Sequence, residues 1–362
     1  EKALLDSALS TVSRAVSPKS TIPCLEGILL KAGLAVSVTG FNLETGITVN
    51  LGAHVTEAGV CVMPARLFCE IVRKLPDEEV NIVVDKDWHV TVTGGGAFFQ
   101  FMAMSAEDYP DLPDVRSEKA ISLPQNALRE MIGNTIFSVS ENQTRPIHTG
   151  CLFEIDNTSV TMVAVDNCRM ARWTWNTVDP IGRELKFVVP AVALREVEKI
   201  LSDTDTELRI YPDEKHILFE IGDATLVCRL LEGEFFNWRR VLPSEDGIIL
   251  VVRVADLTAC LERVNLIVSE KIKSPVRCVF SENIADFYTQ NSIGSAHDTC
   301  AIAGNGGELE IGFLCRYLLD ALRAVPDEEV TLKLQNGLSP ILFTPVNEKK
   351  DFTYMVLPVR LH

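Results

Sequence analysis

The chain has 362 residues, of which 47% are hydrophobic and 23% are charged, as in a globular protein with a substantial core. Its length fits two or three domains, and no run of 18 or more apolar residues predicts a membrane-spanning helix. The formal net charge of −16 argues against a simple basic nucleic-acid-binding domain, and the ten cysteines, with no CxxC pair, predict reduced, buried thiols of a cytoplasmic protein.

Three similar segments follow one another along the chain. Each is predicted to open with a helix that has apolar residues at helical spacing, at residues 1–15, 125–139 and 255–268. Each helix is followed by a proline and then a strand-like run, at Pro23, Pro146 and Pro275. Alternating patterns predict further strands, in the first segment at 60–63, 81–85 and 90–93.

A second helix in each segment carries a repeated phrase, and these helices are predicted at 65–75, 191–201 and 313–324. The phrase reads RLFCEIVRKLPDEEV at 66–80, RYLLDALRAVPDEEV at 316–330, and VALREVEKILSDTDTEL at 192–208, where the turn is degraded. Leu75, Leu201 and Val325 hold the same place in each copy, about 125 residues apart, which is the size of a whole domain.

Each copy is predicted to close on an apolar strand that ends in proline, as FMAMSAEDYPDLP, FFNWRRVLP and TYMVLPVRL, at Pro113, Pro243 and Pro358. We therefore predict an α+β protein of three tandem domains, each with two helices and about eight short antiparallel strands. The domains are predicted at 1–114, 115–243 and 244–362, with short charged linkers near 114–117 and 244–247.

Linear motifs for catalysis or metal binding are missing from the sequence. The six histidines form no HxH or HExxH motif, and no GxGxxG, Walker loop or GxSxG elbow occurs. The glycine-rich segment 304–307 precedes Glu308 rather than a phosphate-binding lysine, and we interpret it as a loop. We therefore predict no catalytic residue, no metal site and no cofactor.

The charge is unevenly distributed along the chain. The six predicted helices hold eleven of the 34 basic residues but only nine of the 50 acidic ones. Ordinary amphipathic helices would account for this difference. Helices that together line one surface facing a polyanion would also account for it.

Several motifs, in the same order, resemble those of the bacterial DNA polymerase III β subunit, the sliding clamp. VAVDNCRMA at 163–171 is similar to the family's VATDGHRLA, and EGEFFNWRRVLP at 232–243 is similar to its DGRFPDYRRVLP. The C-terminal MVLPVRL and the tripeptides Pro64-Ala65-Arg66 and Thr144-Arg145-Pro146 also match. The resemblance covers essentially the whole chain.

The resemblance implies a DNA clamp fold that forms a ring as a head-to-tail homodimer, with the family's first strand missing from this numbering. It implies a cytoplasmic DNA sliding clamp, a non-catalytic processivity factor that encircles duplex DNA and tethers the replicative polymerase. The implied partners are duplex DNA bound without sequence preference, the DNA polymerase III alpha subunit and other proteins with a clamp-binding motif, the clamp loader and a second copy of the chain, but no membrane.

The resemblance also implies three sets of site residues. DNA-facing cations are expected at Lys19, Arg73, Lys74, Arg145, Arg195, Lys199 and Arg323. A groove for partner peptides is expected at His148, Val165, Arg169, Met170, Arg240, Val241, Leu338, Met355, Leu357, Pro358, Val359 and Arg360. At the dimer seam, Met104 is expected to pack against Ile267 and Val268 of the other copy.

Other interpretations stay open at this point. The cations also fit solvated surface charges, and Val241, Leu357 and Val359 also fit core strands. His148, Asn167, Cys168 and Phe236 depart from the family pattern and leave the peptide preference of the groove undecided. The alternatives for the whole chain are a scaffold that binds partner peptides without DNA, or a small-ligand enzyme on the same three domains.

Overall fold

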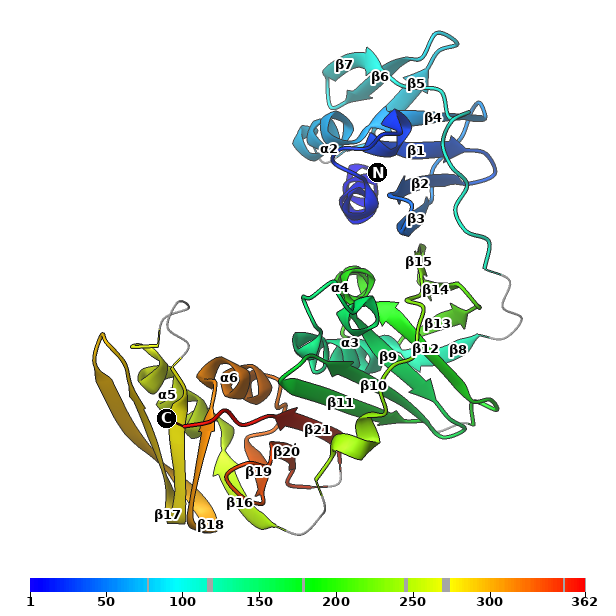
Figure 1. Ribbon diagram of the computed structural model, residues 1–362. Coiled ribbons are helices and arrows are strands. Elements are labelled where there is room, and N and C mark those ends of the chain that lie inside the picture. The colour runs from blue at the N-terminus through cyan, green and yellow to red at the C-terminus, as the bar shows by residue number, and fades with distance from the viewer. Residues whose placement is uncertain are drawn as a thin grey trace. The chain divides into compact units, whose positions relative to one another are not determined.

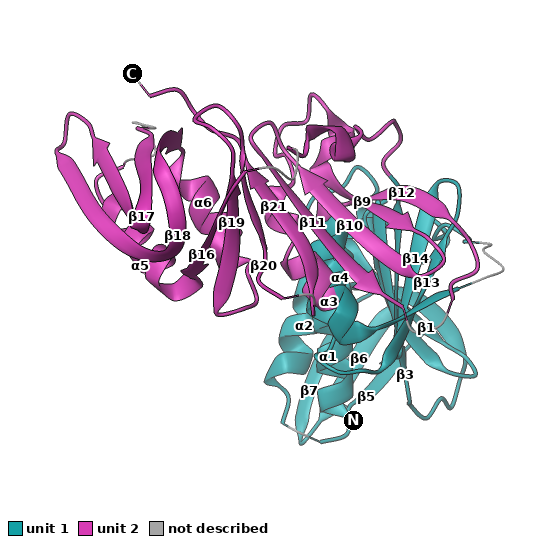
Figure 2. Ribbon diagram, turned by 90° about the horizontal axis from the view of Figure 1, so that it is seen from below, with its two compact units in different colours: residues 1–128, 192–230 teal, residues 129–191, 231–362 magenta. Residues whose placement is uncertain are grey.

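The computed structural model describes residues 1–76, 78–115, 120–177, 180–243, 247–268, 274–347 and 349–361 (Figure 1). The chain forms two compact units, one of residues 1–128 and 192–230, the other of residues 129–191 and 231–362 (Figure 2). The predicted linkers near 114–117 and 244–247 lie partly outside the described residues, at 116–117 and 244–246.

The first unit contains an eight-stranded antiparallel sheet, a three-stranded sheet and the helices α1 (Lys2–Val12) and α2 (Ala65–Lys74). The larger sheet is formed by β1 (Gly27–Ala32), β2 (Val36–Phe41), β3 (Thr45–Leu51), β4 (Gly59–Pro64), β8 (Ile121–Pro124), β13 (Glu207–Pro212), β14 (His216–Ile221) and β15 (Ala224–Arg229). Its order is β4-β1-β2-β3-β15-β14-β13-β8. The smaller sheet has β5 (Asn81–Val84), β6 (His89–Gly94) and β7 (Ala97–Met102), in that order.

The second unit contains a ten-stranded sheet and the helices α5 (Val254–Asn265) and α6 (Cys315–Arg323). The strands are β9 (Gly150–Ile155), β10 (Ser159–Val165), β11 (Arg169–Asn176), β12 (Leu185–Pro190), β16 (Ile248–Arg253), β17 (Val276–Gln290), β18 (Ser295–Phe313), β19 (Glu329–Leu334), β20 (Ile341–Pro345) and β21 (Asp351–Val356). Their order is β12-β9-β10-β11-β21-β20-β19-β16-β18-β17. Helices α3 (Gln125–Gly133) and α4 (Ala191–Ile200) contribute residues to both units.

The repeated phrase forms an amphipathic helix in the first and third copies, as predicted. In α2, Phe68 and Val72 are fully buried, whereas Arg73 and Lys74 are exposed. In α6, the three leucines and the one alanine at 318–322 are buried, and Arg323 is exposed. Apolar positions three and four residues apart face the core, and the cations of the last turn remain in solvent.

Neighbouring copies share their sheets edge to edge. Strand β3 of the first copy pairs with β15 of the second, with Val49 opposite Ala224. Strand β11 of the second copy pairs with β21 of the third, with Met170 opposite Met355. At both junctions a strand from the first half of one copy joins the last strand of the next, so the copies are linked by backbone hydrogen bonds.

Several predicted elements differ from the structure. The second and third copies begin with strands, β8 and β16, rather than with their first helices. The closing segment at 235–243 contains a 3-10 helix, Trp238–Val241, instead of a strand, because Phe235 and Trp238 pack onto the face of the sheet. The third copy has six named strands rather than about eight, since β17 and β18 are 15 and 19 residues long.

The glycine-rich segment at 304–307 lies inside β18 and is not a separate loop. Gly304 and Gly307 have φ angles of 124° and 62°, and the register of the β17–β18 pair shifts here. A Cβ atom on Gly306 would lie 2.3 Å from the carbonyl oxygen of Phe280. A side chain at these positions would clash with the neighbouring backbone or require a strained φ angle. The glycines therefore allow β18 to continue through a bulge.

Candidate functional site

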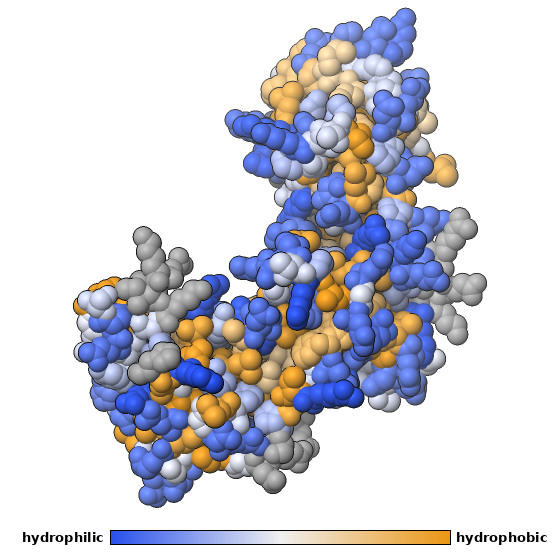
Figure 3. Space-filling model, in the orientation of Figure 1, coloured by the Kyte–Doolittle hydropathy of each residue, from blue (hydrophilic) through white to orange (hydrophobic). Residues whose placement is uncertain are grey.

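An apolar cluster lies on one face of the sheet in the second unit. Leu152 on β9, Val163 on β10 and Met170 on β11 point to this face, and Met355 on β21 joins them across the junction of the second and third copies. Phe235 and Trp238 from the segment after β15 cover part of the cluster, and Ile147, Phe236 and Leu242 are only partly buried against it. On the face seen in Figure 3, apolar side chains of this unit lie at the surface between hydrophilic ones.

Three aromatic rings form one wall of this cluster. The His148 ring meets Phe235 and Phe236 edge-on, with ring centroids 5.5 and 6.0 Å apart. The two phenylalanine rings are 5.7 Å apart. Burial, assisted by the charge of Arg145, lowers the pKa of His148 from its ordinary 6.5, so the ring is neutral at pH 7.

A charged network borders the same cluster at Glu154. This carboxylate accepts hydrogen bonds from Arg239 Nη1 at 2.7 Å and from Trp238 Nε1 at 3.2 Å, and Lys186 Nζ lies 3.2 Å from it. Burial alone would raise the pKa of Glu154, but these three donors outweigh it, and the net shift is downward. The carboxylate therefore holds Trp238 and Arg239 in place over the sheet.

The structure gathers part of the expected peptide groove into this cluster. Val165, Met170 and Met355 are buried in it, and His148 lies on its aromatic wall. The other apolar residues expected in the groove lie at or near the surface, where Leu338, Val241 and Leu357 are exposed and Pro358 and Val359 are half-buried. Arg240 and Arg360 are exposed as well.

The C-terminal segment is held to the sheet by its backbone. Leu357 donates its amide to the carbonyl of Cys168 at 2.8 Å, and Val359 donates to that of Gly312 at 2.8 Å. A Cβ atom on Gly312 would lie 2.7 Å from Leu361 and from the Val359 carbonyl. The backbone at 357 and 359 is thus held beside the turn between β10 and β11 and beside β18.

Four members of this site were not predicted from the sequence, namely Leu152, Val163, Phe235 and Trp238. Residues 152 and 163 lie on the face that carries Met170. Because β9 and β10 are buried on both faces, no alternation of apolar and polar residues marks that face in the sequence. Both aromatic residues lie within the family-like segment 232–243. Their packing on the face of the sheet depends on residues outside this segment, so the segment alone does not predict it.

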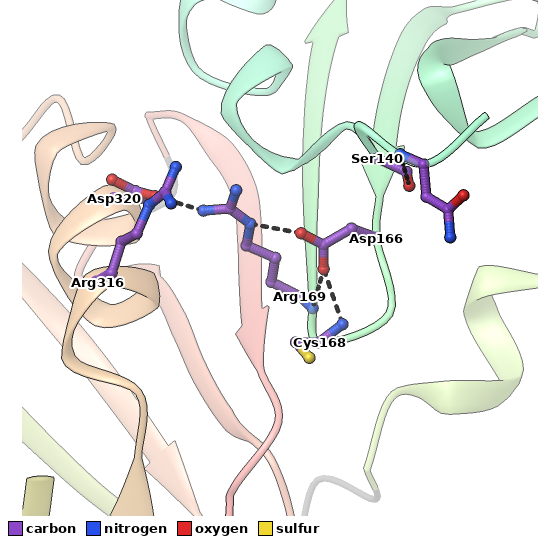
Figure 4. Close-up of polar contacts among 7 residues, drawn as sticks. Ser140, Asp166, Cys168, Arg169, Arg316 and Asp320 are labelled. Carbon is purple, nitrogen blue, oxygen red and sulfur yellow. Dashed lines mark hydrogen bonds and ion pairs between the residues drawn. The ribbon is translucent and has the colours of Figure 1, made fainter. Parts of the chain in front are cut away.

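Arg169 has a different position from that expected of a groove rim. Its side chain is buried, and it reaches from β11 to Asp166 Oδ2 at 2.9 Å and to Asp320 Oδ2 of α6 at 2.5 Å (Figure 4). The rings of Tyr317 and Phe137 lie 4.7 and 5.8 Å from its guanidinium carbon. Arg169 therefore links the second copy to the third through its ion pairs.

The cations expected to face DNA are all exposed. Arg73, Lys74 and Arg195 form no ion pair with another described residue, whereas Lys199 pairs with Glu196 at 2.9 Å and Arg323 pairs with Glu262 at 2.9 Å. Lys19 and Arg145 are exposed in loops that precede equivalent 3-10 helices, Pro23–Glu26 and Pro146–Thr149.

Met104 was expected on the closing strand of the first copy, but it lies just beyond that strand. It follows β7, exchanges two backbone hydrogen bonds with Val62, and packs in a cluster around Leu25 and Tyr109. The exposed apolar residues in this region are on β7 itself, where Phe98 and Met102 are 62% and 52% exposed. On the third copy Ile267 and Val268 are half-buried, and the neighbouring Leu266 is 83% exposed.

Within the described residues, no cluster of three or more histidine, cysteine or acidic side chains has the geometry of a metal site. All ten cysteines are free, and nine of them are buried. None of the described helices is long and apolar enough to cross a bilayer.

Comparison with known proteins matches this geometry to one family. Models of the N-terminal, central and C-terminal domains of the DNA polymerase III beta subunit match residues 1–113, 122–237 and 239–360. The chain belongs to the DNA polymerase III beta subunit family. It has the three-domain DNA clamp fold and the role of a DNA sliding clamp, a processivity factor without catalysis of its own.

Individual clamps match over nearly the whole chain. The beta sliding clamp of Synechococcus elongatus is 30% identical, over 99% of this chain and 97% of the relative. The crystal structure of the Bacillus subtilis sliding clamp is 28% identical with a TM-score of 0.93, covering 100% of this chain and 98% of that one. A Pseudomonas aeruginosa clamp, solved bound to griselimycin, is 28% identical with a TM-score of 0.94, covering 99% and 98%.

Proposed function

We propose that two copies of this clamp close head to tail into a ring around duplex DNA, and that the cluster around Met170 is a groove for partner peptides. The proposal rests chiefly on the way the copies share their sheets. A strand from the first half of one copy pairs with the last strand of the next, as β3 with β15 and β11 with β21.

The same rule leaves two strand edges for a second chain. In the third copy, the segment equivalent to β3 and β11 is the first half of β18, residues 295–302. It pairs with β17 on one side. Strand β7 is the last strand of the first copy and pairs only with β6 among the described strands. Pairing β18 of one chain with β7 of another would repeat the two internal junctions and cover Phe98 and Met102.

The DNA surface is supplied by the helices. Arg73, Lys74 and Arg195 are exposed cations without an ion pair among the described residues, and Lys19 and Arg145 add exposed charge at two equivalent loops. Lys199 and Arg323 contribute through ion-paired side chains. Contacts of this kind go to phosphates, carry no sequence information and permit sliding.

The groove would take linear segments of the DNA polymerase III alpha subunit, of the clamp loader and of other proteins with a clamp-binding motif. Its buried floor of Val165, Met170 and Met355 suits apolar anchors of a peptide, and Leu357 and Val241 are exposed beside it. The neutral, half-buried His148 keeps the aromatic wall free of charge at pH 7. We place this assembly in the cytoplasm, where the family acts.

Retention on DNA of different topology tests this function. The protein is loaded with its cognate clamp loader onto nicked circular plasmid, and half of the sample is then linearised. A topological clamp remains on the circle and is lost from the linear DNA through its ends. Equal retention on both forms would contradict the proposed ring.

A further inference from the structure

One polar ring lies in the aromatic wall of the groove. The ring centroid of His148 is 5.5 Å from that of Phe235 and 6.0 Å from that of Phe236. Phe235 is buried in the cluster that contains Met170, and Phe236 is partly buried against the same cluster. An imidazole therefore interrupts a wall that is otherwise apolar.

The first copy has an apolar residue at the equivalent place. The 3-10 helices Pro23–Glu26 and Pro146–Thr149 each lead directly into a strand that begins with glycine, so Leu25 corresponds to His148. Leu25 is 1% exposed and belongs to the cluster that includes Phe41. Since a leucine fills this place without any polar atom, packing alone does not require a histidine in the second copy.

The backbone of His148 is fixed, whereas its ring nitrogens are free to bind. The amide of His148 donates to the carbonyl of Arg145 at 3.0 Å, and its carbonyl accepts the amide of Ser140 at 2.9 Å. The ring nitrogens bond to no other described residue, and they are not sealed from solvent as the buried Ser138 Oγ is. The half-buried ring is therefore left to hydrogen-bond with water in the free protein.

The charge state of the ring decides what it can bind. Burial first, and then the charge of Arg145, lowers the pKa of His148 below its ordinary 6.5. At pH 7.5 the neutral imidazole offers one N–H donor and one acceptor nitrogen, which match a hydroxyl or a carboxamide. A carboxylate only accepts, so it would suit the exposed Arg145 better than the ring.

A peptide that covers the wall removes water from the ring. An apolar side chain placed over His148 returns no hydrogen bond, and the unpaired nitrogens then disfavour binding by about tenfold. A side chain that bonds to the imidazole avoids this loss. A polar group in a binding site discriminates between such ligands more strongly than an apolar pocket discriminates between side chains of similar size.

We propose that His148 selects partner peptides that carry a hydroxyl or carboxamide side chain where they meet the aromatic wall. A serine, threonine, asparagine or glutamine of the peptide bonds to the imidazole, and apolar anchors of the same peptide fill the floor of Val165, Met170 and Met355. This inference rests on the proposed groove and adds the class of residue that the partners of this chain carry there.

A double-mutant cycle between protein and peptide tests this selection. The probe is the clamp-binding peptide of the cognate polymerase alpha subunit, synthesised with asparagine and, separately, with the similarly sized leucine at each position in turn. Fluorescence anisotropy at pH 7.5 gives the affinity of each peptide for wild type and for His148→Leu. At one position wild type should bind the asparagine peptide more tightly, and its ratio of asparagine to leucine affinity should exceed that of His148→Leu by about tenfold. At the other positions the two proteins should give the same ratio.

Two further variants separate the imidazole from the shape of the wall. His148→Gln keeps a donor and an acceptor and should retain the preference for asparagine. Phe236→Leu changes only apolar surface and should weaken both peptides of a pair alike. A preference that Phe236→Leu abolishes and His148→Leu retains would overturn the proposal.

Other outcomes would also overturn it. The selection by His148 fails if wild type and His148→Leu give the same ratio at every position although the peptides bind. It fails as well if aspartate binds more tightly than asparagine and Arg145→Ala removes the gain, because the contact would then belong to Arg145. Failure of the proposed groove is distinguishable, since wild type would then bind no peptide, or would bind it in a way that Leu357→Ala does not weaken.

Discussion

Arg169 Nη1 and Asp320 Oδ2 lie 2.5 Å apart and join β11 of the second copy to α6 of the third. The same guanidinium donates through Nε to Asp166 at 2.9 Å, and Asp166 also accepts the amides of Cys168 and Arg169 at 2.7 and 2.9 Å. The arginine therefore ties a tight turn of one copy to a helix of the next, inside a single unit of the fold.

Removing one partner of this buried arginine should destabilise the second unit. Asp320→Ala leaves the Arg169 charge with only Asp166, and we expect a loss of about 3 kcal/mol in the free energy of unfolding. Urea unfolding followed by circular dichroism measures it. Arg316→Ala is the control, since the exposed Arg316 reaches Asp320 only at 3.8 Å and should change stability by less than about 0.5 kcal/mol. Equal effects of the two variants would contradict the structural role of Arg169.

Affinity for partner peptides should depend on the exposed apolar residues beside the cluster. Leu357→Ala, and separately Phe236→Ala, should weaken binding of a clamp-binding peptide from the cognate polymerase alpha subunit by about tenfold, because each removes apolar area from the groove. Fluorescence anisotropy with the labelled peptide measures this. Ile293→Ala, at an exposed apolar position between β17 and β18, should leave the affinity unchanged. A loss confined to Ile293→Ala would place the groove elsewhere.

Stability should fall on acidification through His148. Burial lowers its pKa below 6.5, so the folded state binds fewer protons than the unfolded state in that range. The contribution is complete above pH 6.5 and is lost as the pH falls through the folded-state pKa. The difference in unfolding free energy between wild type and His148→Asn should therefore shrink from pH 7.5 to pH 5. A difference that stays constant, or grows toward low pH, would contradict a neutral buried ring.

Sequence patterns predicted the helices better than the surfaces. The repeated phrase predicted α2 and α6 because its apolar spacing is local information. The strand predicted at 235–243 is wrong, since only tertiary packing turns Phe235 and Trp238 onto a sheet face. Arg169 was expected at a rim for the same reason, because Asp320 lies 151 residues away in the chain and no local pattern reveals that pairing.

Exposed cations on the helices should control the affinity for DNA. Arg73→Glu with Lys74→Glu should weaken binding to a short duplex and lower the slope of log affinity against log salt by about two, one per lost phosphate contact. Anisotropy across a salt series measures the slope. Arg209→Glu, on strand β13 rather than on a helix, is the control and should leave it unchanged. An unchanged slope in the double variant would remove Arg73 and Lys74 from the DNA surface.

Sedimentation equilibrium of wild type and of Phe98→Glu with Met102→Glu tests the central proposal of a two-copy ring most directly. Both substituted side chains are exposed on β7, so the variant should fold, but it places charge where β18 of a second chain would pair. We predict that wild type sediments at twice the chain mass of 40.0 kDa at micromolar concentration and that the variant sediments at 40.0 kDa. A monomeric wild type, or a variant that remains dimeric, would contradict the ring.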